Sequence, residues 1–559
     1  MDAAASAGTL HAATLRTPAG EDPLNLDLRT RHPSGSAIVR DRLEGVGDAR
    51  RFLPSDIRDL AAFRAKAAEV DARITGAART DWIEAVRAPG ERAQARLDAV
   101  REGTGYLVTT GQQPGLFGGP LYSLYKAISA VLLAERLETA LGAPVAPLFW
   151  TASEDHDWAE ADHTWMVGVD NELHRLQLPE VEGAGDQPLH RLPMGPGVEQ
   201  CISQLEELLP DTDFKAGVID RLRAAFRPEA TLPEAFEDWF AELLAPLGML
   251  FVQAHAPALK TLSRPRLLHE LAHSDRHERA LLARGEELDA AGYGLQVSIM
   301  DGGVNLFMEG PAGRERLYRE GDRFRLRHSE ATFTLSEIEA RVAEDPSILS
   351  PNVLLRPVVE SAVFPTLTYV AGPGEQAYFA QLAPLFEAHG VGMPIVFPRL
   401  GSTVVEGKVG KVLEKFDLDI EELDRPFHEL AGDRARDDVP DEVRKALGAF
   451  RGTIARGVQE LTEAAREVDP TLKGPIQHVR SVAFDALGDV EKKIVQAVKR
   501  ESEITLQQIE KAHLHLFPDT RPQERVFNAN YYLARYGFGF VEAVTESFRA
   551  ALPPFDGSA

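Results

Sequence analysis

The segment SEDHDWAEADH, residues 153–163, places four groups capable of acid–base chemistry side by side: Glu154, Asp155, His156 and Asp157. Neighbouring carboxylates repel one another unless a cation is close, and a metal ion, a protonated histidine or a substrate ammonium group would serve. A histidine among carboxylates can also transfer protons near neutral pH. Three interpretations stay open: a solvated acidic loop, an ammonium-binding and proton-transfer loop, or a metal site whose ligands are His156, Asp157, Asp162 and His163.

A second candidate site is the glycine-rich segment GQQPGLFGG, residues 111–119. It follows a predicted strand and precedes a predicted helix, a position in which backbone N–H groups bind phosphate or other anions. It contains no Walker sequence and only a distorted GxGxxG, so the spacing equally allows a structural turn. Tyr122 and Lys126 lie one turn apart on the predicted helix. Lys126 is either placed to reach a bound carboxylate or phosphate, or is a solvated surface lysine.

Five short apolar runs are expected to position these loops, and each ends in a polar or glycine-rich segment. The runs are residues 106–110, 145–150, 249–253, 367–371 and 394–397. Helical patterns separate them, and strands that alternate with helices predict an α/β fold with a parallel sheet. In such sheets ligands bind beyond the carboxyl ends of the strands.

Other parts of the chain predict inserts and an arm. Residues 170–233 are polar and then helical, and the run LQVSIMDGGVNLFMEG predicts a small antiparallel sheet over residues 295–335. Apolar residues recur at three- and four-residue steps through 447–468 and 476–498, which predicts an antiparallel helical hairpin with a coiled-coil-like seam. Such a hairpin packs on the body or joins two chains. Residues 56–100 are also helical, and we expect them to pack on the same arm.

Composition narrows the functional classes. The chain has 559 residues, which implies several domains or one core with large inserts. Its net charge of -25 argues against a general nucleic-acid-binding protein. Cys201 is the single cysteine, so neither an intramolecular disulfide nor a thiolate metal cluster is expected, and we interpret it as a buried packing residue rather than a nucleophile. We find neither signal-peptide character nor a membrane-length apolar window, so we expect the cytoplasm.

Four segments resemble the bacillithiol biosynthesis cysteine ligase family, BshC. They are GQQPGLFGGPLYSLYKAI from Gly111, PLFWTASEDHDWAEADH from Pro147, SPNVLLRPVVESAVFPTLTYVAGPGEQAYFAQL from Ser350 and PDTRPQERVFNANYYLARYG from Pro518. The resemblance spans residues 51–548 or so and departs from the family pattern at VQAHAP, after the third strand. It implies that cysteine is joined through its carboxyl group to the amine of glucosaminyl-malate, the last step of bacillithiol synthesis.

The resemblance also implies the architecture: a Rossmann-like parallel-sheet core, two connecting-peptide inserts and a C-terminal antiparallel coiled coil that forms a homodimer. The expected boundaries are an N-terminal helical segment (1–100), the core (101–169, 236–270 and 351–400), the first insert (170–235), the second insert (271–350) and the C-terminal domain (401–559). A nucleotide is expected beside the coiled coil. Neither nucleic acid nor membrane is expected as a partner.

The reaction assigns roles to residues. Because a carboxylate needs activation before it condenses with an amine, ATP, ADP or a preactivated donor is expected, yet HxGH and KMSKS are absent and GGPLY occupies the HxGH place. The acidic loop would hold substrate ammonium groups, and His156 or Asp157 would accept a proton, with Asp155 and Glu154 beside them. The predicted substrate-binding residues are Gly111, Gln112, Gln113, Gly115, Gly118, Tyr122, Lys126, Asn352, Arg356, Gly372, Gly374, Glu375, Tyr378 and Gln381, with Arg356 as a fork for a malate carboxylate. The predicted nucleotide-binding residues are Arg399, Ser402, Gln523, Glu524 and Arg525, and no metal ligand is predicted in this assignment.

Two alternatives stay open. The acidic loop favours a metal-dependent hydrolase or phosphoesterase if His156 and Asp157 bind a divalent ion. A non-enzymatic scaffold is the third interpretation, in which the coiled-coil arm carries the function.

Overall fold

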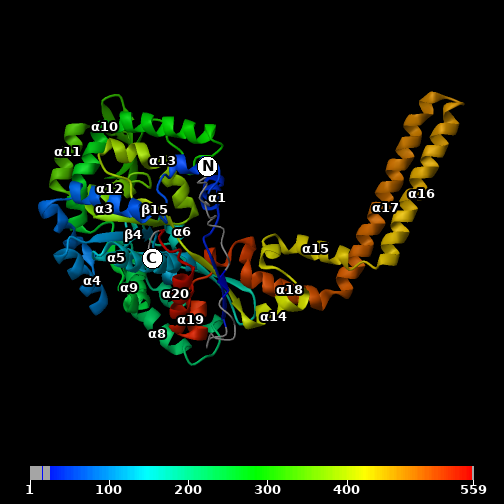
Figure 1. Cartoon of the computed structure of the whole chain (residues 1–559), viewed down its shortest axis with the longest axis horizontal. Helices are drawn as coiled ribbons and strands as arrows, with labels where there is room; N and C mark the ends of the chain where they lie inside the picture. Colours follow the sequence, from blue (N-terminus) through cyan, green and yellow to red (C-terminus); the bar gives the residue numbers. More distant parts are fainter. Residues whose placement is uncertain (1–14, 17–25, 312, 557–559) are drawn as a thin grey trace, which may run out of the picture. The chain divides into compact units, whose positions relative to one another are not determined.

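The computed structural model describes residues 15–16, 26–311 and 313–556, and the chain divides into two compact units (Figure 1). The core unit extends to Val404 and resumes at Glu524, and the arm unit spans Val405–Gln523. The expected C-terminal domain of residues 401–559 therefore differs from the observed division, because the last helices belong to the core unit.

The centre of the core unit is a six-stranded sheet in the order β15-β14-β4-β5-β8-β3. The five predicted strands are all present and run parallel: β4 (Tyr106–Gln112), β5 (Val145–Thr151), β8 (Leu250–Gln253), β14 (Thr366–Ala371) and β15 (Ile395–Pro398). β3 (Val86–Arg87) adds an antiparallel edge. The strands are apolar on both faces because helices cover both sides of a parallel sheet.

Two crossover helices define where a ligand can bind. α5 (Leu121–Leu141) connects β4 to β5, and α13 (Pro373–Ala388) connects β14 to β15. From the adjacent strands β4 and β14 the chain proceeds toward opposite edges of the sheet. A crevice forms at such a switch point, beyond the carboxyl ends of the strands.

The N-terminal helices cover this sheet, and our expectation that residues 56–100 pack on the arm is wrong. α3 (Leu60–Arg73) packs against β14, and α4 (Gly90–Glu102) packs against β5. Phe63 of α3 contacts Phe555, with ring centroids 5.1 Å apart. The remaining N-terminal elements are β1 (Leu15–Arg16), β2 (Leu26–Arg31), α1 (Ala37–Glu44) and α2 (Ala49–Phe52).

Both inserts contain helices and short strands. The first contains α6 (Trp158–Ala161), β6 (His163–Val167), β7 (Leu173–Gln177), α7 (Gly197–Leu208), α8 (Lys215–Ala225) and α9 (Leu232–Leu244). The second contains α10 (Pro257–Ala290), β9 (Gly303–Gly310), β10 (Gly313–Glu320), β11 (Arg323–Leu326), β12 (Thr332–Thr334), α11 (Leu335–Glu344) and β13 (Leu349–Pro351), and α12 (Arg356–Val363) follows it.

The predicted antiparallel sheet is present, but residues 295–300 are not one of its strands. The hairpin instead joins β9 to β10. Gln381 provides the reason, because its side chain accepts from Val297 N over 3.0 Å and donates to Val297 O over 2.9 Å. These two bonds satisfy the backbone groups that a neighbouring strand would otherwise pair.

The C-terminal helices α19 (Asn530–Tyr536) and α20 (Gly539–Ala551) pack on the core unit. α20 lies against α5, where the ring centroids of Phe548 and Tyr125 are 5.3 Å apart.

The arm unit is helical, as predicted. α16 (Asp441–Arg466) and α17 (Lys473–Glu501) lie side by side as an antiparallel hairpin (Figure 1). Its other helices are α14 (Gly407–Phe416), α15 (Phe427–Asp437) and α18 (Glu503–Leu516), and β16 (Gly401–Glu406) precedes them in the chain. Across the described residues, no helix combines the length and apolarity that crossing a membrane requires.

Candidate active site

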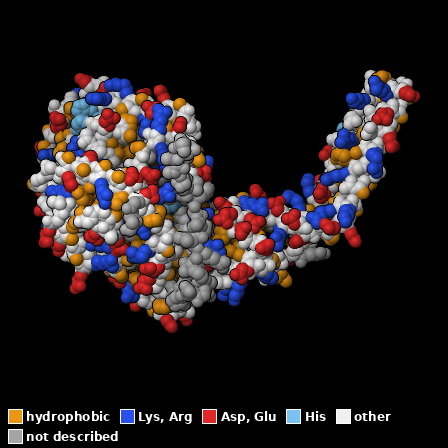
Figure 2. All heavy atoms as spheres, viewed as in Figure 1, with side chains coloured by type: hydrophobic (Ala, Val, Ile, Leu, Met, Phe, Trp, Pro, Cys, Tyr) orange, Lys and Arg blue, Asp and Glu red, His pale blue; other side chains and the backbone are white. Residues whose placement is uncertain are grey.

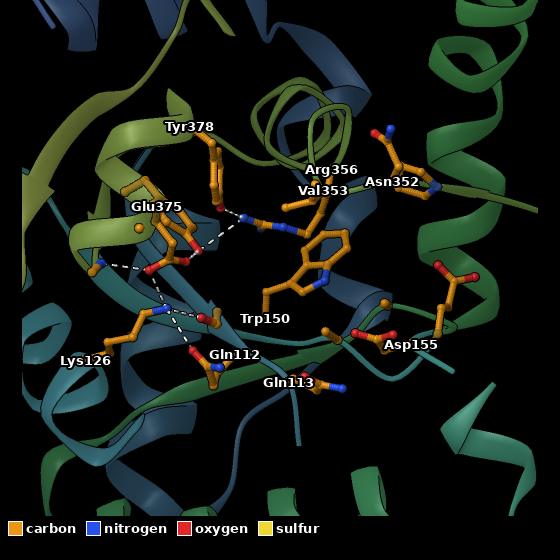
Figure 3. A pocket seen from close by; sticks show the side chains of 18 of the residues that line it. Gln112, Gln113, Lys126, Trp150, Asp155, Asn352, Val353, Arg356, Glu375 and Tyr378 are labelled. Carbon is orange, nitrogen blue, oxygen red and sulfur yellow. Dashed lines mark hydrogen bonds and ion pairs between the residues drawn. The ribbon is translucent and has the colours of Figure 1, made fainter. Parts of the chain in front are cut away.

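A cavity of about 490 Å³ lies beyond the carboxyl ends of the parallel strands of the core unit. The predicted residues that line it are Gly111, Gln112, Gln113, Tyr122, Lys126, Glu154, Asp155, His156, Asn352, Arg356, Gly372, Gly374, Glu375, Tyr378, Arg399 and Arg525. The strand-end loops therefore meet in one space, as the parallel sheet implied. In Figure 3, Trp150 lies between Lys126 and Glu375 on one side and Asp155 on the other.

Lys126 is not a solvated surface lysine. Its side chain is buried, and Nζ lies 2.7 Å from Glu375 Oε2 while donating to Gly111 O and, over 3.2 Å, to Gln112 Oε1. Burial alone would raise the pKa of the Glu375 carboxyl, but the Lys126 charge and the bonds from Tyr369 and Gly372 hold it below its ordinary value. Lys126 therefore positions the β4 and β14 loops and is not an unpaired cation for a ligand.

Arg356 is also engaged within the protein. Its Nη1 donates to Glu360 Oε2 over 2.6 Å, and Nη2 donates to the hydroxyls of Tyr369 and Tyr378 over 3.1 and 3.3 Å (Figure 3). Glu360 takes Nη1, and the two tyrosine hydroxyls take Nη2, so both ends of the fork that the sequence assigned to a malate carboxylate have protein partners. Arg356 lines the cavity and contributes charge to it, but its bidentate face is not available.

The two carboxylates of the acidic loop that line the cavity differ in their partners. Glu154 is buried and forms an ion pair of 2.5 Å with Lys260 at the start of α10. Asp155 Oδ1 accepts from the backbone N–H groups of His156 and Asp157 over 2.8 and 3.3 Å. Among the described residues nothing is bonded to Asp155 Oδ2. One loop carboxylate thus has a fixed partner, and the next has an oxygen left for a ligand.

His156 receives a hydrogen bond from Arg314 of β10. Nη1 of Arg314 lies 3.1 Å from Nδ1 of His156. Because a guanidinium can only donate, Nδ1 is the acceptor and the imidazole proton is on Nε2. Burial, and then the charge of Arg314, lower the pKa of His156 below its ordinary value. In this state the ring presents an N–H donor.

Asp157, predicted as a catalytic residue, lies outside this cavity. It is exposed, and its Oδ1 accepts from Glu160 N over 3.0 Å to cap α6. The four proposed metal ligands do not converge either. Where three or more potential ligand atoms of described side chains lie within 4.8 Å of one another, the residues are other ones. The hydrolase interpretation is therefore not favoured.

The second half of the glycine-rich segment is held as a turn by other parts of the chain, whereas Gly111, Gln112 and Gln113 line the cavity. The N–H of Leu121, the first residue of α5, donates to Phe527 O over 2.8 Å, and Asn530 Nδ2 donates to Phe117 O over 2.8 Å. Gly118 has a φ of 95°, and a Cβ there would lie 2.9 Å from the Trp239 ring. The C-terminal segment thus occupies the helix end that was predicted to bind an anion, and neither Gly115 nor Gly118 lines the cavity.

Two of the predicted substrate-binding residues are bonded to each other at the start of α13. Gly372 N donates to Glu375 Oε2 over 2.7 Å. The N–H group of Gly372 therefore has a carboxylate of the protein as its partner. Gln381 is absent from the cavity wall, since it binds the backbone of Val297.

Four of the five predicted nucleotide-binding residues are bonded to other residues of the protein. Arg399 donates to both oxygens of Glu524 over 2.9 and 2.6 Å, and this pair is buried. Ser402 is bonded to Thr30 over 3.3 Å. Gln523 belongs to the arm unit, where its Nε2 donates to His515 O over 2.7 Å. These contacts leave Arg525 as the member of the set that lines the cavity without an ion pair among the described residues.

Two arginines of β10 line the cavity and were missed. Arg314 and Arg316 are two residues apart, so their side chains leave the same face of the strand. Both contact the ring of Phe307, with 3.8 and 5.4 Å between guanidinium carbon and ring centroid. Within the described chain, no carboxylate lies within ion-pair distance of Arg316. The alternation in GRERL, residues 313–317, indicates that both arginines leave one face of a strand. No local pattern predicts that this strand lies beside the carboxyl ends of the parallel sheet.

Cys201 is buried, and its Sγ lies 3.3 Å from Gln177 O. Burial raises the pKa of its thiol to about 11. A thiol in this state is a packing residue, which confirms the interpretation from the sequence.

Comparison with known proteins identifies relatives over nearly the whole chain. A family model described as "Bacillithiol biosynthesis BshC, N-terminal Rossmann-like domain" matches residues 25–400, and one described as "Bacillithiol biosynthesis BshC, C-terminal coiled-coil domain" matches residues 402–555. A Salinibacter ruber protein is 34% identical over 466 residues, which cover 82% of this chain and 84% of the relative. A Solibacter usitatus protein is 29% identical over 518 residues, which cover 92% and 95%. Both relatives carry the name "Putative cysteine ligase BshC".

Proposed function

The chain belongs to the BshC family of bacillithiol biosynthesis enzymes, the cysteine ligases, and we propose that it joins the cysteine carboxyl group to the amine of glucosaminyl-malate in the last step. The observation that carries this proposal is the charge pattern of one cavity. Asp155 offers an unbonded carboxylate oxygen, and Arg316 and Arg525 offer guanidinium groups without carboxylate partners among the described residues. We place the reaction in the cytoplasm, where a thiol product stays reduced.

The substrates match this pattern in chemical class. Cysteine and glucosaminyl-malate each carry an ammonium group, which an acidic side chain such as Asp155 complements. The malate part carries two carboxylates, and guanidinium groups bind carboxylates through two parallel hydrogen bonds. Arg316 and Arg525 take this role in place of Arg356, whose Nη1 and Nη2 are bonded to Glu360 and to the hydroxyls of Tyr369 and Tyr378.

The proton balance assigns different roles to two neighbouring residues. The substrate ammonium must lose a proton before its nitrogen attacks the cysteine carboxyl carbon, and Asp155 is placed to accept it. As the C–N bond forms at the activated carboxyl carbon, negative charge develops on its carbonyl oxygen. The bond from this carbon to the activating group then breaks, and that group leaves with the bonding electron pair. His156, with its proton on Nε2, is a donor that can stabilise this charge. His156 is therefore assigned as a hydrogen-bond donor and not as the base.

Activation of the cysteine carboxyl group is still required, and ATP, ADP or a preactivated donor stays a proposal. The glycine-rich segment gives this proposal no phosphate site, because Leu121 N, at the start of the helix that follows it, donates to Phe527 O. We therefore assign no residue to nucleotide phosphates and no step to a nucleotide.

The experiment compares two neighbouring aspartates. Four cell lines are profiled for thiols and for glucosaminyl-malate: a null strain without this protein, and strains whose only copy is wild type, Asp155→Asn or Asp157→Asn. Asn at position 157 still caps α6. Asp157→Asn is therefore the control, because it removes the same charge as Asp155→Asn but at a position outside the cavity. We expect the null and Asp155→Asn cells to lose bacillithiol and accumulate glucosaminyl-malate, and Asp157→Asn cells to resemble wild type. Normal bacillithiol in the null cells would falsify the assignment, and equal losses in both variants would refute the role of Asp155.

A further inference from the structure

A histidine cluster lies on α10, away from the residues that line the cavity. His269, His273 and His277 occur at four-residue steps, so they share one face of the helix. His389, which follows α13, packs beside them, with its ring centroid 4.7 Å from that of His269 and 4.8 Å from that of His277. Figure 2 shows pale-blue histidine side chains gathered at the upper left of the core unit.

Three of these rings are arranged as a ligand set. One ring nitrogen each from His269, His277 and His389 lies within 4.8 Å of the other two. Nδ1 of His269 and Nδ1 of His389 are buried, and neither has a hydrogen-bond partner. His389 is only 2% exposed. Buried polar atoms are normally paired, so these two unpaired nitrogens indicate a missing partner.

A buried carboxylate sets the orientation of two of the rings. Glu270 Oε2 accepts from His277 Nδ1 over 2.6 Å and from His389 Nε2 over 3.2 Å. Since these nitrogens carry the protons, His277 Nε2 and His389 Nδ1 keep their lone pairs. In zinc sites, a carboxylate that does not bind the metal orients the histidine ligands in this way.

We propose that His269, His277 and His389 bind one divalent ion of the zinc class, with Glu270 orienting two of the ligands. Neutral imidazoles without thiolates suit zinc and similar transition metals. Zinc prefers four ligands, and because His269 is partly exposed, a water molecule completes the set. His273 is not counted, since its Nδ1 is bonded to His269 O over 3.0 Å.

A hydrogen-bond chain connects this site to the cavity. Glu270 Oε1 also accepts from Asn305 Nδ2 over 2.9 Å, and Asn305 Oδ1 accepts from Asn352 Nδ2 over 3.0 Å. Asn352 lines the cavity, and its Oδ1 accepts from Leu354 N and Leu355 N over 3.0 Å each. The ion therefore has a positioning role. Its ligands His277 and His389 hold Glu270, and Glu270 in turn holds the part of the cavity wall that precedes α12.

The test uses the purified full chain, made metal-free with a chelator and titrated with Zn²⁺ alone. We expect one Zn²⁺ per chain, a rise in melting temperature, and a tetrahedral visible spectrum when Co²⁺ replaces zinc. His269→Ala is the informative variant, because Nδ1 of His269 has no partner whose loss would unfold the metal-free protein. It should weaken Zn²⁺ binding at least about 100-fold, and Glu270→Gln should weaken it about 10–100-fold.

His174→Ala is the matched control, since His174 sits in a different, exposed group with Asp170 and Glu172. It should leave Zn²⁺ affinity, stoichiometry and the Co²⁺ spectrum unchanged. The proposal is overturned if the wild-type chain binds no stoichiometric Zn²⁺, if His269→Ala binds it equally well, or if His174→Ala abolishes binding. Metal content and spectrum are measured without turnover, so failure here is distinct from failure of the ligase assignment.

Discussion

Nη1 of Arg314 donates to Nδ1 of His156 over 3.1 Å, which links the second insert to the loop after β5. The bond leaves the imidazole neutral with its proton on Nε2. It also places a positive charge beside a ring that burial already disfavours in its charged form, so the pKa of His156 lies below its ordinary value. The insert therefore decides the protonation state of a residue in the cavity.

Replacing Arg314 should raise the pKa of His156 toward its unfolded value of about 6.5. In the wild-type chain the folded pKa is lowered, so between that pKa and about 6.5 the unfolded state binds more protons. The contribution of His156 to stability therefore rises with pH in this window and is lost as the pH falls. In Arg314→Met the two pKa values of His156, folded and unfolded, lie closer together, so the pH range over which His156 contributes to stability narrows.

Titration of ¹³C-labelled histidines by NMR, with His156→Ala to assign the resonance, measures this pKa directly. Arg323→Met is the control, because Arg323 lies on β11 of the same antiparallel sheet and donates to Thr332 over 2.8 Å. An unchanged His156 pKa in folded Arg314→Met would contradict the prediction.

Breaking the Glu154–Lys260 ion pair should destabilise the chain strongly. The two side chains are 11% and 4% exposed, so Lys260→Met leaves a buried carboxylate without its cation. We expect a loss of about 3–5 kcal/mol in the free energy of unfolding, measured by chemical denaturation. Glu154→Gln combined with Lys260→Met should recover most of this loss, because no charge then stays buried.

The control for this prediction lies on the same helix. Arg279 and Asp275 of α10 form an ion pair of 2.9 Å whose side chains are 69% and 48% exposed. Arg279→Met should cost about 0–1 kcal/mol. The ion-pair argument fails if Lys260→Met costs no more than this surface variant.

We predict that the α16–α17 hairpin joins two copies of the chain. Val458 and Ile476 are buried, yet Leu461 and Val479 of the same apolar stripes are 54% and 58% exposed. Exposed apolar residues on paired helices are typical of a surface that a further helix covers. Light scattering after size exclusion should give a dimer for the wild-type chain and a monomer for Leu461→Glu/Val479→Glu.

Gln459→Glu/Gln477→Glu adds the same charge at exposed polar positions of these helices and should stay dimeric. The hairpin is not the interface if the wild-type chain is a monomer. The same holds if Gln459→Glu/Gln477→Glu is a monomer while Leu461→Glu/Val479→Glu stays dimeric.

The expected and observed strands show what local pattern can predict. The runs at residues 106–110 and 367–371 became β4 and β14 because a buried parallel strand needs a continuous apolar segment, and each run carries one. The hairpin of α16 and α17 followed from helical periodicity in the same way. The strand predicted over residues 295–300 is absent. Gln381, 84 positions away from Val297, bonds to the backbone N–H and C=O groups of Val297, which a strand would use for pairing.

By itself, the sequence determined the strands, the helices, the loops at the strand ends and the family, because these depend on residue types a few positions apart. Only the tertiary structure decided which charges are paired. Lys260 pairs with Glu154, which is 106 positions away in the sequence, and Glu524 pairs with Arg399, which is 125 positions away. Asn530 closes the glycine-rich loop from 413 positions away. Such partners are chosen by packing, and an ionisable group keeps or loses its availability to a ligand according to what packs beside it.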